Sequence, residues 1–260
     1  MIKKVIKILK ENERIDDLQI NNLKIIQNKN GFCFGIDSVI LSNFASDIKN
    51  NSNVIDLGTG TGIISFLLLA KCNIKHITGI EVQENVAEMV NRSIQLNGLE
   101  EKFNVINCNV KDILYNVKRE SFDVVVSNPP YKKMNTGGKN LDEVKLISRH
   151  EVLADIYDFI EASKKVLKDK GSLYIVHRPE RLADIMCALR NNKIEPKKIQ
   201  FVYSNKESKE AKLVLIKAIK NGGQFLKIEK PLYIYEADGT YSEEILKIYN
   251  IKKENNNGKK

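Results

Sequence analysis

Residues 53–62, with the sequence NVIDLGTGTG, constrain the fold more than any other stretch of the chain. Apolar and β-branched residues predict a buried strand, and Gly58, Gly60 and Gly62 then predict a turn. The apolar run at residues 63–71 predicts a helix directly after it. Glycine lets a backbone approach a ligand where a Cβ would clash, and a helix N-terminus adds unpaired N–H groups. This order of elements is typical of a parallel α/β sheet that binds a ligand at the turn.

Asp56 lies two residues before the first of these glycines and indicates what kind of ligand binds there. The spacing is G-x-G-x-G rather than the G-x-G-x-x-G of dinucleotide sites, and a carboxylate would repel a pyrophosphate. An acid beside the loop suits a ligand that carries an ammonium or a sulfonium group, and S-adenosylmethionine carries both. We therefore expect S-adenosylmethionine as the cofactor, bound by Asp56, Gly58, Thr59 and Gly60.

Polar side chains also follow the next two predicted strands. Strand two ends at Glu81, just before Val82, and a carboxylate at this position can accept both hydroxyls of a ribose. Strand three leads to Asn109 and Val110, where a polar side chain is in position to contact the adenine of the cofactor. Asp112 competes for that contact, and the sequence leaves the choice open. Each side chain alone is also consistent with a surface polar residue, but successive strands ending in polar candidates make a coherent site.

A buried strand is predicted to stop abruptly at the motif Asn128-Pro129-Pro130-Tyr131. Proline lacks an N–H and restricts the residue before it to extended geometry, so Asn128 lies at the carboxyl end of that strand. The Asn128 carboxamide oxygen and the Pro129 carbonyl offer two acceptors to a planar NH₂ group. Tyr131 adds a flat face for a heteroaromatic ring, and such stacking is worth about 1–3 kcal/mol per base. A proline-rich turn with an aromatic plug is the alternative.

The motif assigns roles that the structure can locate. We predict Asn128, Pro129 and Tyr131 as catalytic residues, with Asn128 also beside the cofactor and Pro130 and Tyr131 beside the substrate. The polar segment 132–148 follows directly, and its first residues are Lys132 and Lys133. Lysines beside an amine site can hold nucleic-acid phosphates, so both are expected to contact the substrate. A solvated loop is an equally weighted alternative.

Composition sets wider limits. The 260-residue chain is 42% hydrophobic and carries a net charge of +9, which permits attraction to a polyanion, although lysines spread over solvated faces would give the same charge. The four cysteines lack CxxC pairing and zinc spacing, so we expect thiols in a reducing compartment and no metal. The first ten residues interleave lysines with apolar residues, and nothing approaches about twenty apolar residues in a row. We expect a cytoplasmic protein without membrane contact.

The chain divides into three predicted parts. Residues 1–50 form an extension, with a lysine-rich helix, a strand pair at 23–27 and 32–34, and a helix start that Asp37 or Ser38 caps. Residues 51–249 form the catalytic domain, and the charged residues 250–260 form a disordered tail.

The expected fold is an α/β sheet of seven mostly parallel strands with helices on both faces. Gly171 predicts a turn before a strand at 172–177. Strands at 199–203 and 213–217 have no helix between them, which predicts one antiparallel strand in a hairpin. His177 is expected to be a structural or surface residue.

Asp56 to Gly62, Glu81 and the Asn128 motif, in this order and spacing, resemble the Rossmann-like class I methyltransferases that act on planar amino groups and use S-adenosylmethionine. Other segments resemble the bacterial subfamily that methylates the N6 amine of the adenine beside the anticodon of a valine-accepting tRNA; these are residues 13–17, 34–38, 148–151, 177–181 and 222–223. The resemblance covers nearly the whole chain. It implies tRNA as the partner, and a monomer is expected.

The resemblance also implies residue roles. Asp56, Gly58 and Gly60 surround the methionine part of the cofactor, and Glu81 holds its ribose. Asp37 falls in a segment near the methionine end of the cofactor, which raises it above a helix cap. Asn109 stands where many relatives have an acid. Asn128 and Pro129 hold the target amine, and Tyr131 stacks on its ring.

Other functions fit some of the same motifs. A methyltransferase acting on a glutamine amide of release factors uses a similar motif, but carries a sizeable helical domain before the glycine loop. A methyltransferase acting on DNA adenine or ribosomal guanine is a further alternative. A non-catalytic nucleic-acid-binding module is disfavoured by the presence of Asp56, Glu81 and Asn128 together.

Overall fold

A computed structural model of the chain describes residues 8–29, 35–131 and 154–250. Several predicted features lie wholly or mostly outside these residues: the N-terminal helix, the strand at 32–34, Lys132 and Lys133 with the segment 132–148, and the C-terminal tail. In the described part of the chain, no helix has both the length and the apolar character needed to cross a bilayer.

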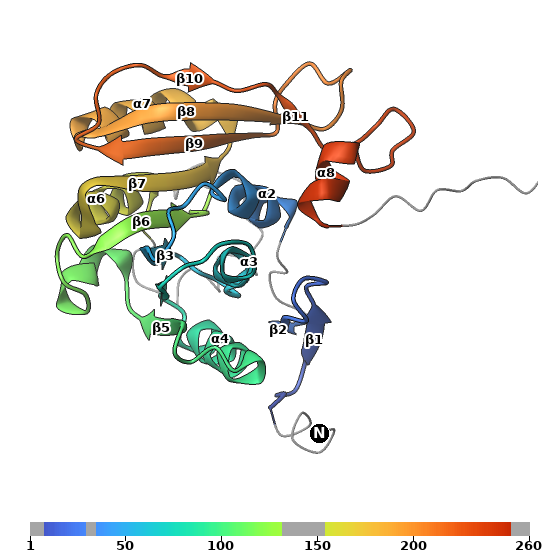
Figure 1. Cartoon of the computed structure of the whole chain (residues 1–260), viewed down its shortest axis with the longest axis vertical. Helices are drawn as coiled ribbons and strands as arrows, with labels where there is room; N and C mark the ends of the chain where they lie inside the picture. The colour runs from blue at the N-terminus through green and yellow to red at the C-terminus, as the bar shows by residue number, and fades with distance from the viewer. Residues whose placement is uncertain (1–7, 30–34, 132–153, 251–260) are drawn as a thin grey trace, which may run out of the picture.

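Nine strands of the described chain form one sheet, in the order β10-β8-β9-β7-β6-β3-β4-β5, with β11 also paired to β8 (Figure 1). All pairings are parallel except those of β9, which runs antiparallel to both β7 and β8. The predicted seven strands with one antiparallel member are confirmed, and two-residue strands extend one edge. The strands are β3 (Asn53–Leu57), β4 (His76–Glu81), β5 (Phe103–Asn107), β6 (Phe122–Ser127), β7 (Leu167–His177), β8 (Ile194–Tyr203), β9 (Leu213–Lys220), β10 (Lys227–Ile228) and β11 (Leu232–Tyr233).

Helices cover both faces of this sheet because its central strands are apolar on both sides. Val54 belongs to the hydrophobic cluster on one face, and its neighbour Ile55 belongs to the cluster on the other. The first face carries α2 (Ile36–Phe44), α3 (Ile63–Lys71), α4 (Glu84–Asn97) and α8 (Glu243–Ile248). The second carries η1 (Val110–Tyr115), α6 (Ile156–Val166) and α7 (Leu182–Asn191), the last preceded by η2 (Pro179–Arg181).

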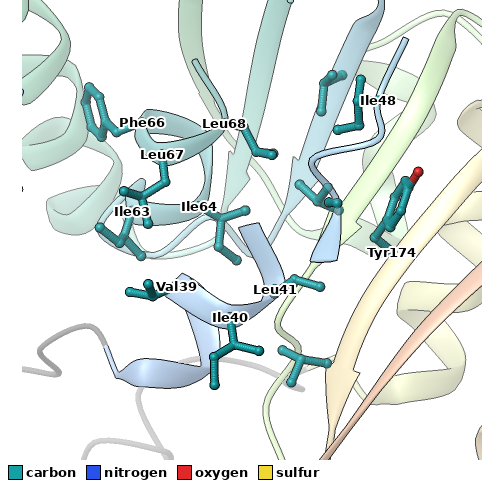
Figure 2. Close-up of a cluster of buried hydrophobic side chains, with 14 of the residues drawn as sticks. Val39, Ile40, Leu41, Ile48, Ile63, Ile64, Phe66, Leu67, Leu68 and Tyr174 are labelled. Carbon is teal, nitrogen blue, oxygen red and sulfur yellow. The ribbon is translucent and has the colours of Figure 1, made fainter. Parts of the chain in front are cut away.

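The packing of α2 on α3 fixes the position of the N-terminal segment. Figure 2 shows Val39, Ile40 and Leu41 of α2 close to Ile63 and Ile64 of α3, and all five are buried. Burial of such side chains contributes about 1.5–3 kcal/mol each. The start of α2 is therefore held close to the start of α3, where the glycine turn ends.

The predicted cap of α2 is wrong. The N-cap residue is Gly35, and no side chain donates or accepts a capping hydrogen bond there. Asp37 and Ser38 lie inside the first turn of the helix instead. The carboxylate of Asp37 is well placed for the helix dipole, but its hydrogen bonds go elsewhere.

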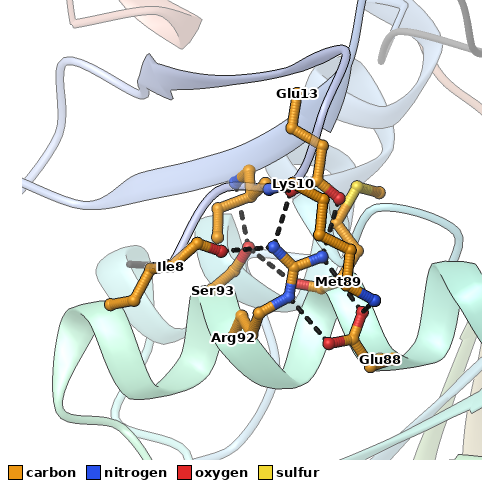
Figure 3. A network of polar contacts seen from close by, with 8 residues as sticks. Ile8, Lys10, Glu13, Glu88, Met89, Arg92 and Ser93 are labelled. Carbon is orange, nitrogen blue, oxygen red and sulfur yellow. Dashed lines mark hydrogen bonds and ion pairs between the residues drawn. The ribbon is translucent and has the colours of Figure 1, made fainter. Parts of the chain in front are cut away.

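The N-terminal hairpin contains a strand that the sequence did not predict. Strand β2 (Lys24–Asn28) pairs with β1 (Glu13–Asp17), which precedes it, with Glu13 opposite Asn28. The hairpin packs on α4 in Figure 1, and Figure 3 shows Arg92 of α4 bonded to Glu13 and to the backbone carbonyl of Ile8. The hydroxyl of Ser93 also accepts a hydrogen bond from the backbone N–H of Ile26.

Gly171 does not mark a turn. It lies within β7, which begins at Leu167, five residues before the predicted strand. A Cβ on Gly171 would lie 2.9 Å from Leu167 Cδ2 and 3.1 Å from the carbonyl oxygen of Asp123. The pairing of β6 with β7 also shifts register between Phe122 and Val124. The glycine therefore serves a close approach at a strand irregularity, which a sequence pattern cannot distinguish from a turn.

Candidate active site

The register of three parallel strands brings the predicted motifs to one edge of the sheet. Leu57 at the end of β3 pairs with Ile80 of β4 on one side and with Ser127 of β6 on the other. The next residues of these strands are Gly58, Glu81 and Asn128, so they lie at the same level. From β3 the chain continues to β4 and β5 on one side and then returns to β6 on the other side of β3, and ligands bind at such a switch point in open α/β sheets.

The glycine turn is shaped by backbone geometry that other residues rarely adopt. Gly58, Gly60 and Gly62 have φ angles of 71°, 54° and 79°. The N–H groups of Gly58 and Thr59 both donate to the carbonyl of Ile80 at 2.9 Å, which ties the turn to β4. A Cβ on Gly58 would come within 3.1 Å of the Phe159 ring, whereas a Cβ on Gly60 would meet nothing within 4 Å. The turn is thus packed at its start and open at Gly60.

Asp56 is fully buried and holds the turn to α3. Its Oδ2 accepts hydrogen bonds of 2.8 Å from the hydroxyls of Thr59 and Ser65. Its Oδ1 has no hydrogen-bond partner among the described residues. Burial raises the pKa of Asp56 to about 6, the two hydroxyls oppose that rise, and the charge of Glu81 adds to it. A buried carboxylate oxygen without a donor is costly, which supports a cationic group in the complete site.

Glu81 joins the turn to the end of β4. One carboxylate oxygen accepts from the N–H of Gly60 at 3.0 Å, and the other accepts from the N–H of Gln83 at 2.9 Å. Burial is the main cause that raises the pKa of Glu81. A carboxylate can accept several hydrogen bonds, and the position of Glu81 at the end of β4 suits ribose hydroxyls. Val82, the next predicted residue, is 41% exposed.

The predicted adenine contact lies on a short helix that the sequence did not indicate. Asn109 is the N-cap of η1, and its Oδ1 accepts from the N–H of Lys111 at 3.0 Å. Val110 is buried, and Asp112 is in the first turn of the same helix. The N–H of Cys108 donates to the carbonyl of Glu81, so this segment lies beside the expected ribose position. The contact of Asn109, or of Asp112 in its place, with the adenine of the cofactor stays a prediction.

Asn128, Tyr131 and Asp37 form one hydrogen-bonded group. The Tyr131 hydroxyl lies 2.7 Å from Asp37 Oδ2 and 2.8 Å from Asn128 Oδ1. The Asn128 amide nitrogen lies 3.4 Å from the hydroxyl of Ser38. Pro129 is buried and Pro130 is exposed. The start of α2 therefore meets the Asn128 motif directly, although the two are about ninety residues apart in the sequence.

The ring of Tyr131 contacts two residues from the end of β7. His177 lies 5.0 Å from it, centroid to centroid and edge-on, and the guanidinium of Arg178 lies 5.1 Å from the ring centroid. Burial lowers the pKa of His177 to about 4. Its Nδ1 accepts from the backbone N–H of Arg178 at 2.8 Å, and its Nε2 has no partner among the described residues. Sequence reasoning assigned neither residue to the site, although both fall in segment 177–181.

A family model of the methyltransferase small domain matches residues 33–201. The chain belongs to the methyltransferase small domain family. The match contains the glycine turn, Glu81 and the Asn128 motif, so the three described parts of the site all lie within the family's domain.

Individual relatives agree with this methyltransferase assignment. The tRNA1(Val) (adenine(37)-N6)-methyltransferase of Flavobacterium johnsoniae is 23% identical over 190 residues, which cover 73% of this chain and 80% of the relative. A predicted O-methyltransferase from Agrobacterium tumefaciens has a TM-score of 0.65 at 20% identity, over 82% of this chain and 95% of the other. The geranyl diphosphate C-methyltransferase of Streptomyces coelicolor A3(2), solved with S-adenosyl-L-homocysteine, has a TM-score of 0.53 at 12% identity, over 71% and 80%. The two structures confirm the predicted fold.

Proposed function

We propose that this methyltransferase uses S-adenosylmethionine to methylate the exocyclic N6 amine of an adenine in RNA, in the anticodon loop of a tRNA. The observation that carries the proposal is the placement of Asn128 and Pro129 level with the glycine turn and Glu81 at one sheet edge. The name of the Flavobacterium relative supports the choice of adenine and of tRNA. A monomeric state and a cytoplasmic location stay predictions, as does the division of the chain at residues 50 and 250.

The residues at this edge fit the cofactor. Gly60 leaves open space beside the turn, and the unpaired Oδ1 of Asp56 suits a cationic group. Glu81 lies at the end of β4 beside the turn, where its carboxylate can accept ribose hydroxyls. Val82, Asn109 and Val110 complete the expected cofactor contacts. When bound, S-adenosylmethionine supplies a methyl group already activated by its sulfonium.

The chain itself must then hold and align the amine. The carboxamide oxygen of Asn128 and the carbonyl of Pro129 accept the two N–H bonds of the target NH₂ group. Acceptance out of the plane of the base draws the nitrogen lone pair away from the ring and toward the methyl group. Orientation of two reactants in this way can contribute about 7–11 kcal/mol to a rate. A base in a loop must also leave its stack to reach the site, at a cost of a few kcal/mol.

Mass spectrometry of nucleosides tests the proposal. Unmodified tRNA, transcribed in vitro, is incubated with the protein and with cofactor labelled in its methyl group, and the digested nucleosides are separated. We expect the label in N6-methyladenosine, at one position of the anticodon loop of a valine-accepting tRNA. Label in another nucleoside, or none in RNA while a protein substrate takes up label, would contradict the proposal.

A further inference from the structure

The hydroxyl of Tyr131 lies within hydrogen-bond distance of two acceptors but has only one proton to donate. The acceptors are Asp37 Oδ2 and Asn128 Oδ1, at 2.7 and 2.8 Å. Neither acceptor oxygen has a proton of its own to donate, so only one of them accepts a hydrogen bond from the Tyr131 hydroxyl at any moment. Since the two distances differ by only 0.1 Å, rotation of the hydroxyl about its C–O bond is enough to move the proton from one acceptor to the other.

Two described contacts support the ring of Tyr131. His177 lies 5.0 Å from it, centroid to centroid, and the guanidinium of Arg178 lies 5.1 Å from its centroid. Burial first, and then the charge of Asp37, raise the pKa of Tyr131, so the hydroxyl keeps its proton. Rotation of the hydroxyl can therefore change the acceptor without any movement of the ring.

The proposed function makes this shared proton important. The target amine must donate an N–H to the same Asn128 oxygen that the Tyr131 hydroxyl approaches. While the tyrosine proton is on that oxygen, one of its lone pairs is occupied and the amine meets a competing donor. A carboxylate is the stronger acceptor, because hydrogen bonds to charged groups are about twice as strong as neutral ones.

We infer that Asp37 is a positioning residue that accepts the hydrogen bond of the Tyr131 hydroxyl when the target amine arrives, and so frees the Asn128 oxygen for the amine. The inference rests on the proposed function. The exchange breaks no covalent bond: the proton stays on Tyr131, its hydrogen bond moves to Asp37, and an amine N–H replaces it at Asn128. The arriving amine supplies the second donor, so both Asp37 and Asn128 then accept a hydrogen bond and neither acceptor is left unpaired.

The inference differs from the role that the sequence predicts for Asp37. If Asp37 bound the cofactor, removal of its carboxylate would lower the affinity of the enzyme for the cofactor. If Asp37 acts through Tyr131, the same removal lowers the activity of the enzyme toward RNA and leaves its affinity for the cofactor unchanged. It also loses its importance when the Tyr131 hydroxyl is absent, because no proton then competes for the Asn128 oxygen.

A double-mutant cycle separates these roles. Asp37→Leu removes the second acceptor at similar volume, and we expect kcat/KM for RNA to fall about tenfold, the equivalent of one hydrogen bond. Asp37→Asn keeps a neutral acceptor and should lose less. The combination of Asp37→Leu with Tyr131→Phe should recover to within about threefold of Tyr131→Phe alone. Calorimetry should show the same affinity for S-adenosylmethionine in all four proteins.

Two outcomes overturn the inference. One is a double variant whose loss is the product of the single losses. The other is an affinity for S-adenosylmethionine that falls in step with kcat/KM, as a cofactor ligand predicts. Thermal melting of each variant shows whether it is folded.

Nuclear magnetic resonance of the free protein tests the shared proton without RNA. The side-chain amide signals of Asn128, assigned with Asn128→Ala, should shift in Asp37→Leu, because the tyrosine proton then stays on the Asn128 oxygen. They should shift the other way in Tyr131→Phe. Unchanged signals in Asp37→Leu would contradict the inference, even if the RNA assay fails because the substrate is different.

Discussion

Two polar networks attach the first fifty residues to the rest of the chain, and they differ in how donors match acceptors. At the hairpin, the five N–H bonds of the Arg92 guanidinium meet five acceptor contacts, to both oxygens of Glu13, both oxygens of Glu88 and the carbonyl of Ile8 (Figure 3). At the site, one Tyr131 proton meets two acceptors. The first network is saturated, whereas the second has one donor too few.

The difference shows what each network can do. A saturated network of charged partners resists change, because every bond that breaks leaves a charge without its partner. A network with a surplus acceptor can change its bonding at no loss, as long as another donor arrives. The hairpin network is therefore expected to control stability, and the site network is expected to control activity.

The largest expected effect is on activity, from Asn128→Ala. Loss of the acceptor oxygen should lower kcat by roughly 10²–10³-fold, the range seen when one preorganised hydrogen-bonding group is removed from an active site. Affinity for S-adenosylmethionine should stay within about threefold of wild type by calorimetry. Equal loss of cofactor affinity and methyl transfer would show that Asn128 mainly binds the cofactor.

The next effect concerns stability and pH at Asp56. Burial raises its pKa to about 6 from an ordinary value near 4. The folded state therefore favours the neutral acid. The stability that Asp56 contributes is fully present below pH 4 and is lost as the pH rises through 6. At about 1.4 kcal/mol per pKa unit the loss is about 3 kcal/mol.

Asp56→Asn removes this ionisation and nearly keeps the shape. The wild type loses this stability between pH 4 and pH 6.5, and the variant does not. The free energy of unfolding of the variant minus that of wild type should therefore become about 3 kcal/mol more positive over this range, measured by urea denaturation. The comparison with wild type cancels the opposite change from His177, whose lowered pKa gives stability above pH 6.5 that is lost on acidification. A difference that does not vary with pH would show that Asp56 does not titrate in this range.

The hairpin network should respond in stability rather than in activity. Arg92→Leu leaves the mostly buried Glu13 carboxylate without its partner, which should cost about 2 kcal/mol. For a chain of this size that corresponds to a Tm lower by about 4–8 °C in a thermal melt. Arg92→Lys keeps the charge but loses the two-pronged geometry, and should cost about half as much. A loss of methyl transfer at 25 °C without a change in Tm would break the contrast between the networks.

The smallest effect is expected at the rim of the same network. Lys10 contacts Glu88 at 2.8 Å, but the two side chains are 61% and 42% exposed. Exposed ion pairs contribute little, so Lys10→Ala should change the free energy of unfolding by less than about 0.5 kcal/mol in urea denaturation. A loss as large as that of Arg92→Leu would mean that exposed charges, and not the Arg92 bonds, hold the hairpin.

Much of the fold could be predicted because its signals are local. The strand 53–57, the glycine turn and the helix 63–71 follow from apolar runs and glycine spacing, and the structure has them at the same bounds. Gly98 is the C-cap of α4 with a φ of 64°, a position where glycine after an asparagine commonly ends a helix. The antiparallel β8–β9 hairpin follows from two apolar runs without a helix between them.

The features that were missed depend on contacts between distant segments. Strand β1 is polar and short, so only its pairing with β2 and its packing on α4 reveal it. The short helices η1 and α8 have few residues and little periodicity. The resemblance of segment 177–181 gave His177 no role, and it becomes part of the site because β7 ends beside Tyr131.

The sequence by itself determined the class of fold, the glycine turn and the planar-amine motif, because apolar periodicity, glycine geometry and proline chemistry act within a few residues. Only the tertiary structure decided which of these side chains lie together and which donors meet which acceptors. Parallel register brought Gly58, Glu81 and Asn128 to one level, and the packing of α2 on α3 carried Asp37 to the Tyr131 hydroxyl. A hydrogen bond depends on distances of tenths of an ångström, and those are set by the whole packed core.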